Sequence, residues 1–101
     1  MKLLTKEILN KFPKLGETDG KDPKDVKIIV KFFTPDSNWT WFLTEYNGED
    51  TFFGYVKEQF DELGYVSLSE LQSVRGPMGL PVERDMYFGD HTLQEVMDGK
   101  I

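Results

Sequence analysis

The sequence contains no cysteine and a single histidine, and these two features exclude several kinds of chemistry. Without cysteine there is no disulfide framework, no thiolate zinc site and no thiol nucleophile. The only imidazole, His91, stands at an expected helix start, where an exposed and non-catalytic histidine is the ordinary role. Residues 75–79, RGPMG, lack the spacing and the preceding strand of a phosphate-binding loop. We therefore predict no catalytic residue and no cofactor.

Long apolar runs are also missing, and no segment has the length needed to cross a bilayer. The first twelve residues, MKLLTKEILNKF, have neither a continuous apolar stretch nor a small-residue cleavage site, unlike a secretory signal. A chain of 101 residues with 39% hydrophobic and 30% charged residues is typical of one soluble globular domain. We expect a single domain over residues 1–101, a cytoplasmic location and no membrane partner.

Positive charge is scarce in most of the chain. Residues 1–31 carry eight lysines and five acids, whereas residues 32–101 carry four basic groups and thirteen acids, within a net charge of −6. An acidic body repels nucleic acid over long distances and disfavours non-specific phosphate binding, although a local basic patch could still bind. Such asymmetry is most often a solvated surface.

The N-terminal segment predicts one short helix and one loop. Thr5 is placed to cap a helix over residues 6–12, with Leu4 and Leu9 in the hydrophobic-staple positions. Residues 14–25, KLGETDGKDPKD, hold two glycines, one proline and seven charges, which predicts a mobile surface loop.

Residues 26–56 predict three antiparallel strands. Residues 26–33 and 39–46 alternate as strands and are joined by the turn-forming sequence TPDSN, while Asn47-Gly48 predicts a two-residue hairpin turn. The facing pairs would then be Trp39–Val56, Trp41–Gly54, Leu43–Phe52 and Glu45–Asp50.

This register gives the sheet two faces of different character. The first face is nearly all apolar and is expected to pack on the helices, with Trp39, Trp41, Leu43 and Phe52 at its centre. The second face mixes lysines and threonines with aromatic rings; it holds Lys27, Ile29, Lys31, Phe42, Phe53, Tyr55 and Lys57. A one-residue slip of the register would exchange the faces.

The second half of the chain predicts short elements. Ser67 and Thr92 each open a capping box, with Glu70 and Glu95 three residues later, so helices should cover residues 68–74 and begin again at residue 93. Residues 64–66 and 83–88 are expected as short strands, and the intervening RGPMGLPV as an irregular loop. The predicted fold is α+β, a three- to four-stranded antiparallel meander with short helices packed mainly on one face.

Acidic residues at the hairpin tip give a weak candidate cation site. Glu45 and Asp50 would face each other, which destabilises a hairpin unless something offsets the repulsion, and Glu49 lies beside them. Oxygen ligands of this kind suit a hard cation, but no twelve-residue calcium loop is present. A splayed, solvated tip is the alternative.

Aromatic side chains interleaved with lysines resemble a platform on which unpaired bases stack. The candidate binding residues are Phe42, Phe53, Tyr55, Lys27 and Lys31. The alternative is that a helix covers this face and the lysines lie at its rim. The acidic body and the lack of a ribonucleoprotein motif favour the covered face.

Two arginines bracket the Gly/Pro-rich loop. Arg75 and Arg84 could clamp a carboxylate or a phosphate, or could pair with neighbouring acids within the chain. Met78 and Leu80 are displayed between Pro77 and Pro81, so they have little conformational entropy left to lose on binding, and this favours a protein contact.

Four motifs resemble those of a family of small bacterial proteins known only as a domain of unknown function. They are TPDSNWTW (34–41), GEDTFFG (48–54), ELGY-SLSEL (62–71) and RGP-GLP-ERD (75–85), within a likeness that runs from the N-terminus to about residue 88. The family is typical of plasmids, conjugative elements and phages. The resemblance implies no catalytic residue, and it implies the context of an accessory gene on a mobile element.

These observations favour a non-enzymatic accessory protein of a mobile genetic element that binds a protein partner. One alternative is an inhibitor of host defence, either restriction or CRISPR machinery, whose acidic surface mimics nucleic acid. A second alternative is single-stranded nucleic-acid binding on the lysine and aromatic face.

Overall fold

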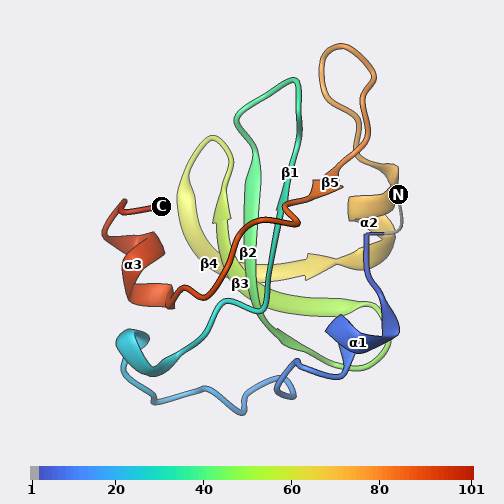
Figure 1. The fold of residues 1–101 in the computed structure, drawn as a ribbon. Helices are drawn as coiled ribbons and strands as arrows, with labels where there is room; N and C mark the ends of the chain where they lie inside the picture. Colours follow the sequence, from blue (N-terminus) through green and yellow to red (C-terminus); the bar gives the residue numbers. More distant parts are fainter. Residues whose placement is uncertain (1–2) are drawn as a thin grey trace.

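Five antiparallel strands carry the fold, in the spatial order β4-β3-β2-β1-β5. The computed structural model describes residues 3–101. The strands are β1 (Val30–Phe33), β2 (Thr40–Tyr46), β3 (Thr51–Lys57), β4 (Asp61–Ser67) and β5 (Glu83–Arg84). The helices are α1 (Lys6–Leu9), α2 (Leu68–Ser73), α3 (Leu93–Met97) and the 3₁₀ helix η1 (Pro23–Asp25). Figure 1 shows that β1 to β4 form a meander and that β5 joins the far side of β1.

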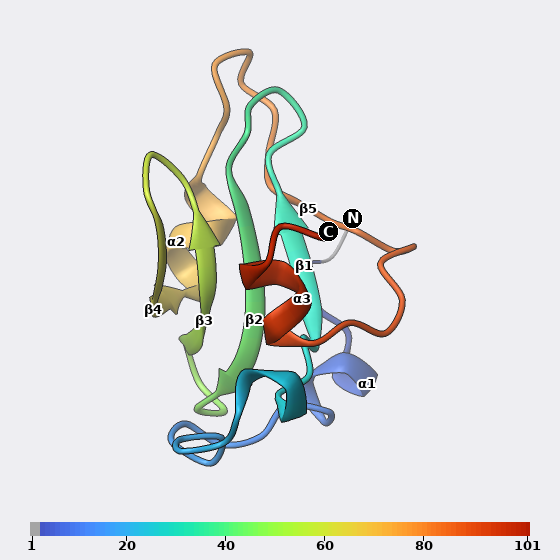
Figure 2. The same cartoon turned by 90° about the vertical axis from the view of Figure 1, so that its left-hand side faces the viewer.

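The predicted α+β class and antiparallel meander are confirmed, with two differences. The sheet has five strands because Glu83 and Arg84 pair with Phe33 and Phe32. Strand β4 extends over seven residues, where only residues 64–66 were expected. The helices lie on both faces of the sheet, not mainly on one: Figure 2 shows α3 in front of the sheet and α2 behind it.

The β2–β3 hairpin has a longer turn than the two-residue turn expected from Asn47-Gly48. The Asn47 side-chain oxygen accepts the backbone N–H groups of Glu49, Asp50 and Thr51 at 2.9, 3.1 and 3.0 Å, and its own N–H donates to the Thr51 carbonyl. Gly48 has a φ of 84°, which suits glycine.

The longer turn moves the register by two residues, so that Trp41 faces Val56 and Leu43 faces Gly54. Up to Leu43 a shift of two keeps every side chain on its face. Beyond Leu43 a bulge exchanges the faces of β2, so that Tyr46, not Glu45, joins Phe52 on the apolar face. The predicted Glu45–Asp50 pair is therefore wrong: Glu45 lies opposite Phe53, just after a bulge.

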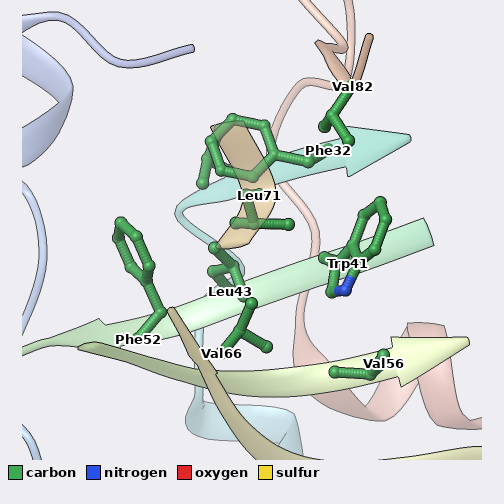
Figure 3. Close-up of a cluster of buried hydrophobic side chains, with 9 residues drawn as sticks. Phe32, Trp41, Leu43, Phe52, Val56, Val66, Leu71 and Val82 are labelled. Atoms are coloured by element: carbon green, nitrogen blue, oxygen red, sulfur yellow. The ribbon is translucent and has the colours of Figure 1, made fainter. Parts of the chain in front are cut away.

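The apolar face of the sheet forms the main core. Trp41, Leu43 and Phe52 are buried as predicted, whereas Trp39 precedes the strand and is 38% exposed. Leu71 of α2 and Val82 close over this face (Figure 3). The cluster consists of Val30, Phe32, Trp41, Leu43, Phe52, Val56, Val66, Leu71 and Val82.

The second face has a smaller core beneath α3. The strand predicted from Val26 begins only at Val30, because the preceding segment pairs with the start of α3: Ile28 N–H donates to His91, and Leu93 N–H donates to Val26, at 2.9 and 2.8 Å. As a result Val26 and Ile28 pack with Phe42 on the second face, where the predicted strand would have placed Lys27 and Lys31 instead. The cluster consists of Val26, Ile28, Phe42, Leu93 and Val96.

The predicted helix starts are confirmed. The hydroxyls of Thr5, Ser67 and Thr92 each accept a backbone N–H three residues later, and Glu95 completes the capping box at Thr92. Helix α1 ends at Leu9, three residues before the expected end. Within residues 3–101 no helix combines the length and the apolar character needed to cross a membrane.

Candidate functional site

Three connections extend from the same end of the sheet. Thr40 of β2 lies opposite Lys57 of β3, which lies opposite Asp61 of β4, so residue 39 and the turn at residues 58–60 project together. The loop of residues 75–82 reaches the same end, as Figure 1 shows. We call this region the loop end.

The segment from Arg75 to Pro81 forms a small closed loop. These two residues pair as an isolated antiparallel bridge, and Gly76 N–H donates to the Leu80 carbonyl at 3.0 Å. Gly79 N–H donates to the Gly76 carbonyl at 2.9 Å, and Gly79 has a φ of 80°, in the left-handed region that favours glycine. The loop is thus ordered by its own backbone.

Asp36 fastens this loop to the turn between β1 and β2. One carboxylate oxygen accepts the N–H of Met78 at 2.8 Å and of Leu80 at 3.4 Å. The other oxygen lies against Gly76, where an added Cβ would come within 1.5 Å of it. The contact therefore requires glycine at position 76. Asp36 therefore holds a segment 42 residues away in the sequence.

The loop end exposes apolar side chains on this fixed backbone. Met78 is 80% exposed, and Leu80, Trp39 and Phe60 are also exposed. A backbone that is already ordered loses little further entropy when the side chains that it presents are bound, which suits contact with another protein.

The two arginines make their hydrogen bonds in different parts of the chain. Arg75 donates to the carbonyls of Gln72 and Val74 at 3.0 and 2.8 Å, at the end of α2. Arg84 donates to the Leu3 carbonyl at 2.9 Å. A joint clamp of the two guanidinium groups on an anion stays a prediction.

The lysine and aromatic face is partly covered. Phe42 is only 2% exposed, with Phe88 against its ring at 5.8 Å and the ammonium groups of Lys31 and Lys57 over it at 5.7 and 6.0 Å. Lys31 also pairs with Asp85 at 3.5 Å. A base could not stack on Phe42 without displacing these groups.

The other members of this face are more exposed than Phe42, although Tyr55 lies opposite it and packs against its cluster. Lys27 pairs with Asp90 at 3.8 Å, and both side chains are well exposed. Phe53 and Tyr55 are half-buried, and Phe53 meets Tyr65 edge to face at 5.1 Å. Burial raises the pKa of Tyr55. Lys27 and Lys31 therefore each have an acidic partner, and Phe53 and Tyr55 are only partly exposed. Stacking of bases on this face stays a prediction.

Glu45 is a buried carboxylate that holds the N-terminal loop. It is 2% exposed, and its oxygens accept the backbone N–H groups of Gly16 and Thr18 at 2.8 and 2.9 Å and the Thr18 hydroxyl. These bonds explain how a charged group can be buried here. They anchor one part of residues 14–25, and the mobility expected of this loop stays a prediction.

The side chain of Asp50 binds residues other than Glu45, and Glu49 takes part through its backbone. Asp50 accepts the hydroxyls of Ser67 and Ser69 at 2.6 and 2.8 Å and the Ser69 N–H at 2.9 Å, and the Ser67 bond is the main cause of its lowered pKa. The Glu49 carbonyl accepts the Tyr46 hydroxyl at 2.6 Å. Across residues 3–101 no cluster of acidic or histidine side chains is arranged to hold a metal ion.

His91 belongs to the structure of α3. Its Nδ1 lies 3.2 Å from a Glu95 carboxylate oxygen, and its ring meets Phe88 edge to face at 4.7 Å. The His91 hydrogen bond is the main reason that the pKa of Glu95 is lowered. This arrangement supports the start of α3.

Sequence reasoning placed Met78 and Leu80 at a candidate site but missed Asp36, which orders their loop. The only signal was a turn aspartate and an unexplained glycine at position 76, far apart in the sequence. Trp39 was missed because it was assigned to the core, and Phe60 because it stands among the acids Glu58, Asp61 and Glu62, in a segment with no strand or helix pattern.

One protein family, described as a protein of unknown function (DUF2958), matches residues 3–98. No curated protein and no solved structure was found to match the chain.

Proposed function

Because this chain belongs to the DUF2958 family, whose function is unknown, we propose a function from the loop end: the protein binds another protein through Met78 and Leu80. The observation that carries the proposal is the hydrogen bonding of Asp36 to the backbone of these two exposed residues. Because the loop is ordered before binding, the free energy gained from its apolar contacts is not offset by an entropy cost of ordering the loop. No enzymatic activity is part of the proposal.

The test compares the protein with a variant that lacks both apolar side chains, Met78→Ser with Leu80→Ser. Each protein is immobilised, exposed to lysate of a bacterial host, and the retained proteins are quantified by mass spectrometry. We expect the retention of one protein to fall at least about a hundredfold with the variant, because burying each of the two side chains contributes about 1.5–3 kcal/mol and about 1.4 kcal/mol corresponds to a tenfold change in affinity.

Met86→Ser serves as the matched control, since Met86 is also exposed but lies outside the loop. It should retain the partner at the level of the unaltered protein. Equal retention by the loop variant, or no specific retention by the unaltered protein, would contradict the proposal.

We propose further that the partner belongs to the host of a mobile element, as the resemblance of the motifs to plasmid and phage proteins suggests. Inhibition of a defence nuclease is the second candidate. Its support is the exposed acidic run at the loop end, Glu58, Asp61 and Glu62. Salt separates the two modes of binding: a complex held by acidic mimicry weakens strongly between low and high ionic strength, whereas one held by Met78 and Leu80 does not.

A further inference from the structure

Strand β4 is an outer strand of the sheet with one open side. Its seven residues pair with β3 without interruption, from Ser67 opposite Thr51 to Asp61 opposite Lys57. In the strand order nothing follows β4 on its other side, and within residues 3–101 no further strand pairs with it. Figure 2 shows β4 at the margin of the sheet, with α2 behind.

The open edge of β4 lacks the usual protection against pairing. Natural edge strands are blunted by lysines, prolines or bulges. Here charge is confined to Asp61 and Glu62 at one end, and the next five residues, LGYVS, carry none. Leu63 and Tyr65 are 45% and 72% exposed, although both are apolar or aromatic.

The strand is complementary to itself in its fully overlapping register. In an antiparallel pair, residues that face each other have their side chains on the same face of the sheet. Because side chains alternate along a strand, the numbers of two facing residues from two copies of β4 must both be odd or both be even, so their sum is even. Full overlap of Asp61–Ser67 with itself meets this condition, with Gly64 facing Gly64 of the second copy.

That register places favourable pairs opposite each other. Leu63 faces Tyr65 of the second copy, and the same pair recurs on the other side of the centre, which buries both exposed side chains. Asp61 faces Ser67 and Glu62 faces Val66, so no acid lies opposite an acid. The acids of the two copies lie at opposite ends of the joint, which limits the repulsion between two chains of net charge −6.

We propose that two copies of the chain associate through β4, antiparallel about a two-fold axis at Gly64, and so form one continuous sheet. The surface is distinct from the loop-end residues Met78 and Leu80, and the inference does not depend on the proposed function. An extended segment of another protein is the other occupant that this edge could take.

A cysteine placed at the centre of the joint tests the register directly, because the native chain has no cysteine. Gly64→Cys is suitable because an added Cβ at Gly64 meets no atom within 4 Å. Facing Cα atoms in an antiparallel pair are about 4.5–5.5 Å apart, within disulfide range. The variant should form a covalent dimer within minutes under mild oxidation at micromolar concentration.

Asp61→Cys is the matched control. In the proposed register position 61 lies about 20 Å from the same position in the second copy, since strands rise about 3.3 Å per residue. This variant should cross-link at least tenfold more slowly than Gly64→Cys. Equal rates would overturn the register.

Sedimentation equilibrium of the unaltered protein completes the test. We expect a concentration-dependent dimer that Tyr65→Lys converts to monomer, whereas Met86→Lys, at another exposed site, leaves it unchanged. A monomer up to about 100 µM, or a dimer that persists in Tyr65→Lys, overturns the proposal. The proposal is also overturned if the protein is a monomer that binds a different protein and the Tyr65→Lys variant loses that binding. In that case the edge of β4 takes up an extended segment of the other protein.

Discussion

Single acidic side chains in this fold bind backbone segments that are distant in the sequence. Glu45 and Asp36 each accept hydrogen bonds from loops far away in the sequence. The local sequence around each acid predicts a solvated turn or a strand, and only the tertiary arrangement supplies their donors. For this reason the residues that order the candidate site could not be predicted from the sequence.

Replacement of Glu45 is expected to lower the free energy of unfolding in proportion to the number of hydrogen-bond acceptor oxygens that are lost. Glu45→Ala leaves the N–H groups of Gly16 and Thr18 without their partners, so it should cost about 3 kcal/mol of unfolding free energy, since an unsatisfied buried group costs about 1–3 kcal/mol. Glu45→Gln keeps one oxygen and should cost about half as much. Urea denaturation at pH 7 measures both, and equal losses in the two variants would contradict this account.

Substitution of Gly76 tests the contact with Asp36. Gly76→Ala places a Cβ against the carboxylate oxygen and should destabilise the protein by about 1–3 kcal/mol, as overpacking does. Asp36→Ala removes the obstructing oxygens, so the double variant should be more stable than the sum of the two single effects by about 1 kcal/mol. Additive effects in thermal denaturation would show that the contact does not couple the two loops.

At the scale of elements, local signals predicted where helices begin but not where strands pair. Thr5, Ser67 and Thr92 act through neighbours three residues away, so their capping is readable from sequence. The alternation of VKIIVKFF fits a strand that begins at residue 26 as well as one that begins at residue 30. What decides the outcome is the pairing of Ile28 with His91, more than sixty residues later.

Asp50 links two elements, the β2–β3 turn and the start of α2, and this link should depend on pH. Hydrogen bonds from Ser67 and Ser69 lower the pKa of Asp50 in the folded state. A lowered folded-state pKa contributes stability that is fully present above the unfolded value, about 3.9, and is lost as the pH falls through the folded value. Asp50→Asn should therefore lower the melting temperature at pH 6, and the difference from the unaltered protein should shrink towards pH 2. A difference that is constant with pH would contradict the linkage.

At the scale of the whole molecule, the fold class could be predicted and the use of its surfaces could not. Alternating apolar residues and turn signals are local, and they yielded the antiparallel α+β meander. Coverage of Phe42 by Phe88 and α3 depends on how the last twenty residues return to the sheet. Exposure of Met78 depends likewise on the attachment of its loop to Asp36.

The strand order also determines how the chain can fold. Strands β2, β3 and β4 are consecutive and joined by short turns, so their pairing closes only small loops, whereas β5 pairs with β1 across about fifty residues. Loop closure over long separations is slower and entropically more costly. The three-strand meander should therefore form first and open last.

In native-state hydrogen exchange, amides of β3 should be the most protected, and the Phe33–Glu83 pairing should open at lower free energy. Truncation after β4 would accordingly leave a partly ordered meander, with the loop end never assembled.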